Sequence, residues 1–146
     1  MVAETDAEYP GERLGLPATG SGSLAGFGRR ILALLIDWLI AYGLTGLAVP
    51  LGIMTIDTLR FTWVGPTVIT VIWMLLGTVA VRLFGFTPGQ YALGLMVKSV
   101  DVRQNVGVGR AFARVLLVFF VVPPLFADSD GRGIQDRITQ TAIIRR

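Results

Sequence analysis

The sequence predicts an all-α membrane protein with two transmembrane helices, a third membrane segment broken by proline, and a small cytoplasmic cap at the interface. Three observations support this fold class: a mean hydropathy of +0.65, a charged fraction of 16%, and two long apolar runs. Soluble domains carry about 25% charged residues, so the deficit here is large. The 146 residues are enough for one domain, which we place at residues 24–146.

Two runs are long enough to cross a bilayer. Residues 31–56 form a run of 26 in which Asp37 is the only charge, and residues 61–81 form a run of 21 with none. Each exceeds the ~20 apolar residues that a ~30 Å hydrocarbon core requires. We expect spans at about residues 29–52 and 61–84, with the first helix ending near Pro50–Gly52. The short loop between them makes the two helices antiparallel neighbours.

The third apolar run is shorter. Only 13 uncharged residues lie between Arg114 and Asp128, and Pro123–Pro124 interrupts them. Runs of about 10–14 residues are more often re-entrant or interfacial than spanning. If the segment at about 111–127 crosses, Arg and Lys divide 8 against 5 across the membrane; if it re-enters, they divide 12 against 1. The positive-inside rule favours the second division, with both termini in the cytoplasm.

The two ends of the chain differ from these runs. Residues 1–23 contain four acidic residues with scattered Gly and Pro, and we expect a disordered acidic tail. Farther on, residues 87–90 read Thr-Pro-Gly-Gln, which is typical of a helix start, and Gly94 would end that helix. Residues 96–102 and the final seven, QTAIIRR, are β-rich. If the tail returns to the cytoplasm, these two segments can pair as a two-strand ribbon.

Asp37 is the residue of the first span that most needs an explanation. A carboxylate within a spanning helix costs ~2.5–3.5 kcal/mol on insertion scales. Asp37 belongs to a stripe of otherwise small residues that begins with Arg30, and small residues let another helix approach closely. The second span offers Thr67, Thr70 and Gly77 as a matching face. The stripe, at steps of three or four, is Arg30, Ala33, Asp37, Ala41, Thr45, Ala48 and Gly52.

Two interpretations of Asp37 remain open at this stage. In the structural one, the carboxylate is paired with an arginine or hydroxyl. The candidate partners are Arg29, Arg30, Arg114, Thr67 and Thr70. In the functional one, it binds a proton or a cation in the cytoplasmic half of the bilayer.

Composition excludes several classes of chemistry. The chain has no Cys and no His, which removes thiolate catalysis and the commonest general base and metal ligand. We therefore expect no enzyme, no catalytic residues, no metal site and no cofactor. Residues 128–131, Asp-Ser-Asp-Gly, lack the remaining ligands of a calcium loop and are interpreted as a turn. The basic residues suit anionic lipid head groups and imply no nucleic acid.

Four segments carry a family resemblance: LAGFGRRILALLID, FTPGQYALGLMVKSVD, GRAFAR and GRGIQDRITQTAIIRR. In this order and approximate spacing they resemble the RDD family of bacterial integral membrane proteins, over about residues 24–146. The arginine and the two aspartates that name that family would be Arg30, Asp37 and Asp136. The chain departs from the family pattern at Gln90, where a basic residue is frequent, and at Gln135, where a His is common.

The resemblance implies a function in transport, since cation/proton antiport has been proposed for some members. We expect Arg30, Asp37 and Asp136 to form one electrostatic unit. Arg114 or a buried water would bridge Arg30 and Asp37, and Asp136 would reach Arg30 or Arg29 at the surface. Two spans are too few to enclose a pathway, so transport requires a homo-oligomer or other membrane proteins. The alternative is a non-catalytic accessory or assembly subunit of a larger membrane complex. The use of Arg with a single Lys suggests a GC-rich, actinobacterial source and a bacterial plasma membrane.

Overall fold

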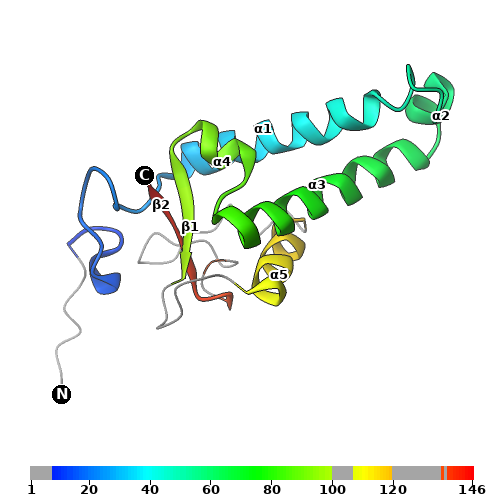
Figure 1. Ribbon diagram of the computed structural model, residues 1–146. Coiled ribbons are helices and arrows are strands. Elements are labelled where there is room, and N and C mark those ends of the chain that lie inside the picture. Colours follow the sequence, from blue (N-terminus) through cyan, green and yellow to red (C-terminus); the bar gives the residue numbers. More distant parts are fainter. Residues whose placement is uncertain (1–7, 100–106, 120–135, 137) are drawn as a thin grey trace.

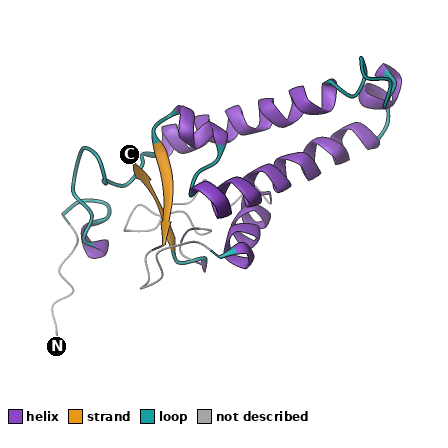
Figure 2. Cartoon of the chain, in the orientation of Figure 1, coloured by secondary structure: helices purple, strands orange, loops and turns teal. Residues whose placement is uncertain are grey.

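The computed structural model describes residues 8–99, 107–119, 136 and 138–146. In these ranges the chain is mostly helical, with a long helical hairpin at one end and a two-strand sheet at the other (Figures 1 and 2). The elements are the 3-10 helix η1 (Glu12–Leu14), α1 (Phe27–Gly46), α2 (Ile56–Phe61), α3 (Val64–Phe84), α4 (Pro88–Ala92), β1 (Leu95–Ser99), α5 (Val108–Phe119) and β2 (Thr141–Arg145).

Helices α1 and α3 run antiparallel and form the hairpin, as the short loop between the two runs predicts (Figure 1). Helix α1 ends at Gly46, earlier than the predicted end near Pro50–Gly52, and a series of turns follows. Glycine is a poor helix former, so Gly43 and Gly46 weaken the last turn well before the proline. The predicted loop contains the short helix α2, which begins where the Thr58 N–H donates to the Thr55 hydroxyl at 3.1 Å.

The two-span prediction is met by one helix. Among the described residues, α3 alone is both long and apolar enough to cross a membrane. Helix α1 has 20 residues, enough to cover ~30 Å at 1.5 Å per residue. It also contains Arg29, Arg30 and Asp37, so its composition falls short of the same criterion. A second span at α1 therefore stays a prediction.

The helix start at residues 87–90 is confirmed as a capping box. The Gln90 N–H donates to the Thr87 hydroxyl at 3.2 Å, and the Thr87 N–H donates to the Gln90 side-chain oxygen at 3.0 Å. Pro88 occupies the first turn. This box fixes the direction in which α4 leaves α3, and it turns the start of α4 toward α1.

The predicted ribbon is also confirmed. Strands β1 and β2 pair antiparallel, with Leu95 opposite Arg145 and Ser99 opposite Thr141. Residues 100–102, the predicted end of the first strand, lie outside the described residues. The pairing brings the last residues of the chain to the end of the hairpin where α1 begins and α3 ends (Figure 1).

Residues 8–23 differ from the disordered segment that we expected over residues 1–23, while residues 1–7 lie outside the described residues. From Glu8 onward the chain forms turns around η1, and then joins the outer side of β2. The Gly22 N–H donates to the Arg145 carbonyl at 2.8 Å, and the Ala25 N–H donates to the Ile143 carbonyl at 2.8 Å. Acidic and glycine-rich composition predicts poor burial, but it does not report that β2 offers an open edge.

A compact apolar core lies where α1, α3, α5 and the sheet meet. Its members are alanines and branched aliphatic residues: Ala25, Ala33, Val81, Leu95, Val97, Ala111 and Ile143. Helix α5 packs on α3 at Gly77, where an added Cβ would lie 3.0 Å from Val115. Pro123–Pro124 and residues 128–131 lie outside the described residues, so the re-entrant path and the turn expected there stay predictions.

Candidate charge centre

The buried face of α1 is the predicted stripe. The buried residues of this helix are Arg30, Ala33, Asp37, Ala41 and Thr45. On the opposite side Leu32, Leu39 and Leu47 are exposed. Ala48 and Gly52 lie beyond the end of the helix, and Gly52 is exposed. The buried face of α1 thus presents one arginine and one aspartate to the interior, and the other residues on this face are small.

Asp37 is 4% exposed and is held by α4. The Thr87 hydroxyl donates to one carboxylate oxygen of Asp37 at 2.5 Å, and the Gly89 N–H donates to the other at 2.7 Å. Hydrogen bonds from neutral donors to a carboxylate are charge-assisted and among the stronger ones in proteins. Asp37 therefore fastens the start of α4 to the middle of α1.

The close approach of α4 depends on glycine. A Cβ added at Gly89 would lie 3.0 Å from the Asp37 carboxyl carbon and would overlap the Ala33 carbonyl. Only a residue without a side chain lets the backbone come this near. The small residue at position 33 and the glycine at position 89 are thus two halves of one contact.

The expected hydroxyl partners of Asp37 were wrong. The Thr67 hydroxyl donates to the Trp63 carbonyl at 2.8 Å, and the Thr70 hydroxyl donates to the Pro66 carbonyl at 2.9 Å, so both bond within their own helix. Neither residue is buried; on α3, Gly77 is the one residue of the proposed matching face that is. Threonine in a helix readily bonds the carbonyl four residues earlier, which removes it as a donor to another helix.

Asp136 joins the C-terminal segment to two helices. It is fully buried, with Arg114 of α5 paired to one oxygen and Arg30 Nη1 of α1 at 3.5 Å from the other. Arg30 Nε also donates to the Ala25 carbonyl at 2.9 Å, and Arg114 Nη1 donates to the Thr141 hydroxyl at 2.9 Å. We expected Arg114 or a buried water to bridge Arg30 and Asp37, and Asp136 to contact Arg30 or Arg29 at the surface. Instead Asp136 is itself the bridge, and it lies in the interior.

A cavity of about 40 Å³ lies next to Asp37 and next to the two arginines that pair with Asp136. Arg30, Asp37 and Arg114 line it, together with the side chain of Gln90 and an apolar wall from α3 that includes Trp73 and Val81. A water needs roughly 10–15 Å³ of such volume and two to four polar partners, so the cavity has room for two or three waters. We call Arg30, Asp37, Arg114 and Asp136 together the charge centre; the first three of them line this small cavity, whose wall is otherwise mostly apolar.

Sequence reasoning missed Thr87 and Gly89 as parts of this site. The signal was present, since the Thr-Pro-Gly-Gln run was read as a helix start. A capping hydroxyl has one proton to donate as well as lone pairs to accept with. In this chain the Thr87 oxygen accepts from Gln90 while its proton goes to Asp37, 50 positions earlier.

The described residues contain no group of three or more His, Cys, Asp or Glu side chains that could hold a metal ion. Fold and charge centre together define a class: a small, mostly helical protein with a helix that can cross a membrane and a buried cluster of charges beside its C-terminal half. Within that class the chain belongs to the RDD family, whose model matches residues 24–140. No curated protein and no solved structure matches the chain.

Proposed function

We propose that the chain is a multi-pass protein of a bacterial plasma membrane, with α1 and α3 both crossing. The exposed faces of the two helices support this, because they carry large apolar side chains while Arg30 and Asp37 of α1 are buried. Arg29, Arg82 and Lys98 lie at the sheet end of the hairpin, and Arg60 lies at the α2 end. By the positive-inside rule, the sheet end faces the cytoplasm.

The pairing of β1 and β2 also constrains the path of the third membrane segment. Strand β1 precedes α5 and β2 follows the segment after it, and the two strands are paired. A chain that leaves and returns to one side of the membrane crosses it an even number of times. This supports a re-entrant segment at 111–127 and a cytoplasmic C-terminus.

We infer that the charge centre takes part in cation- or proton-linked transport of a small solute, in an oligomer. The observation that carries this proposal is a small cavity onto which Arg30, Asp37 and Arg114 all face, inside a chain whose outer faces are apolar. Intramembrane carboxylates and arginines that face a water-sized cavity mark ion and proton pathways. A cavity of about 40 Å³ is too small to be a complete path, so a second copy has to contribute the rest.

Flux measurements in proteoliposomes test this proposal. A pH-sensitive dye inside the vesicles reports proton movement after a Na⁺ or K⁺ gradient is imposed. We expect flux from the unaltered chain, none from Asp37→Asn, and full flux from the control Asp57→Asn, which changes an exposed carboxylate on α2. Flux equal to that of empty vesicles, or flux that Asp37→Asn leaves unchanged, would argue against transport.

One observation favours a second candidate, an accessory or assembly subunit of a larger membrane complex. Both oxygens of Asp37 already accept hydrogen bonds from α4, as a purely structural carboxylate would. The broad exposed apolar faces of α1 and α3 are then surfaces for other membrane proteins. Affinity isolation in mild detergent, followed by identification of the proteins recovered, distinguishes the two. Recovery of the chain with only its own copies would leave the accessory role without support.

A further inference from the structure

An apolar groove of about 490 Å³ lies between the C-terminal half of α3 and α4. Leu76, Val79 and Phe84 of α3 form one wall, and Phe86, Pro88 and Tyr91 form the other. The Tyr91 hydroxyl is the one polar side-chain group among these six residues. The volume falls within the roughly 300–1,000 Å³ of ordinary ligand pockets, and the lining suits a hydrocarbon.

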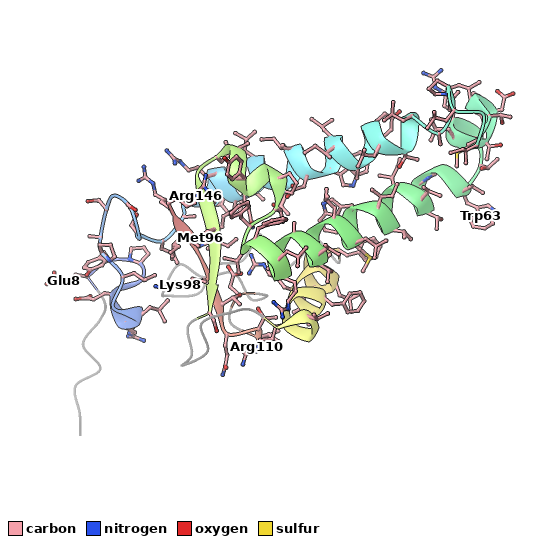
Figure 3. All side chains as sticks on the ribbon, in the orientation of Figure 1. Glu8, Trp63, Met96, Lys98, Arg110 and Arg146 are labelled. Atoms are coloured by element: carbon pink, nitrogen blue, oxygen red, sulfur yellow. The ribbon has the colours of Figure 1, made fainter. Side chains whose placement is uncertain are left out.

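A cation stands at the edge of this groove. The Arg146 guanidinium lies 4.4 Å from the centre of the Tyr91 ring and 5.2 Å from that of Phe86 (Figure 3). The Arg146 N–H donates to the Gly94 carbonyl at 2.7 Å, which fixes its backbone beside α4. The Phe86 ring in turn lies 5.1 Å from the Tyr91 ring and 6.0 Å from the Phe84 ring. Two of the groove's own aromatic side chains thus position the guanidinium.

We propose that this groove binds one anionic phospholipid, with an acyl chain along α3 between Val79 and Phe84 and the phosphate against Arg146. The proposal rests on the membrane insertion proposed above. Charge complementarity identifies the occupant, because an arginine at the end of an apolar groove matches a ligand with a hydrocarbon body and an anionic head. Aromatic and basic side chains occur together at the depth where head groups meet acyl chains. Basic positions beside membrane helices attract anionic lipid at about 1 kcal/mol each.

Native mass spectrometry from nanodiscs tests the site directly. The discs contain equal amounts of phosphatidylglycerol and phosphatidylcholine with identical acyl chains, and the spectrum reports which lipid the released protein retains. About 1 kcal/mol corresponds to a preference for the anionic lipid of roughly five-fold. We expect Arg146→Gln to abolish that preference. Arg82→Gln removes an exposed charge outside the groove and should leave it within two-fold.

A second pair of variants tests the groove itself. Val79→Trp fills the groove from an exposed position and should lower retention of both lipids several-fold. Val71→Trp is the same change at an exposed position of α3 outside the groove, and should leave retention unchanged. Equal preference in Arg146→Gln and the unaltered chain would overturn the proposal, as would equal retention in Val79→Trp and Val71→Trp. A chain that fails to enter nanodiscs would overturn the membrane insertion as well, which separates the two failures.

Discussion

The two ends of the helical hairpin are built in opposite ways. At the sheet end, charged side chains are buried beside an apolar core of alanine and branched aliphatic residues. At the α2 end, large apolar side chains stand on the surface: Leu51, Ile53, Phe61 and Trp63 are each more than 70% exposed. In a water-soluble protein both arrangements would be unfavourable.

A bilayer explains the difference. Exposed Leu and Trp are stable against lipid and at its interface, where polar side chains are costly. Between helices in lipid, apolar contact adds little, so association depends on close packing of small residues and on polar bonds. We infer that the contacts at the sheet end stabilise the fold, whereas the α2 end mainly needs a surface that is compatible with lipid. Four substitutions test that division, from the largest expected effect to the smallest.

Asp136→Asn should have the largest effect. It leaves Arg30 and Arg114 facing a neutral amide in the interior, and breaking a buried ion pair costs about 3–5 kcal/mol. Thermal unfolding in detergent measures the loss. Asp57→Asn, at the exposed α2 end, is the matched control and should leave the melting temperature unchanged. Similar losses from the two variants would remove the contrast between the ends.

Asp37→Asn should come second. The amide keeps one oxygen to accept from α4 but presents an NH₂ group where the other oxygen was, so one charge-assisted hydrogen bond is lost. Such bonds contribute about 1.5–3 kcal/mol. The same detergent assay reports it, and Thr87→Val should give a comparable loss from the opposite side of the contact. If Thr87→Val has no effect, the bond from Thr87 does not hold α4.

Gly89→Ala should destabilise by about 1–3 kcal/mol, the usual cost of overpacking. The added methyl group would push α4 away from Ala33 and Asp37. Gly28→Ala places the same group in open space in the first turn of α1, and it should be neutral or slightly stabilising. Hydrogen exchange of the α4 amides should rise in the first variant only.

Gly43→Ala should have the smallest effect, and it should raise stability where the other three substitutions lower it. A Cβ at this position in α1 meets nothing within 4 Å, and replacing a helical glycine by alanine stabilises by about 0.5–1 kcal/mol. A small rise in melting temperature is therefore expected. A clear fall would mean that another helix covers Gly43 in the proposed oligomer, and the α2 end would then share in holding that oligomer together.

Local signals in the sequence predicted local structure well. The capping box at Thr87 and the two strands depend on neighbouring residues, and the stripe of α1 depends on its period alone. The predicted end of α1 near Pro50 is too late, because Gly43 and Gly46 weaken the helix before the proline is reached. The identity of Asp37's partners could not be predicted, because a carboxylate and a hydroxyl 50 positions apart meet only through the path of the chain between them.

The burial of Asp136 also could not be predicted from the sequence. Family resemblance pointed to the residue, but its depth depends on β2 pairing with β1 and drawing the preceding segment inward. Two arginines from different helices then meet one carboxylate, which no spacing in the sequence encodes. Likewise, residues 22 and 23 are predicted as part of a disordered tail, because composition does not report an available strand edge.

Arg30, Arg114 and Asp136 are expected to act as one unit that fastens the C-terminal segment to the hairpin. A double-mutant cycle tests it most directly: unfolding free energies in detergent for Arg30→Ala, Asp136→Asn and the two combined. Residues that share an ion pair show interaction energies of about 0.5–3 kcal/mol. We expect the double variant to lose less unfolding free energy than the two single variants added together, by an amount in that range. Strict additivity would contradict it, because it would mean that Arg30 and Asp136 contribute to stability independently.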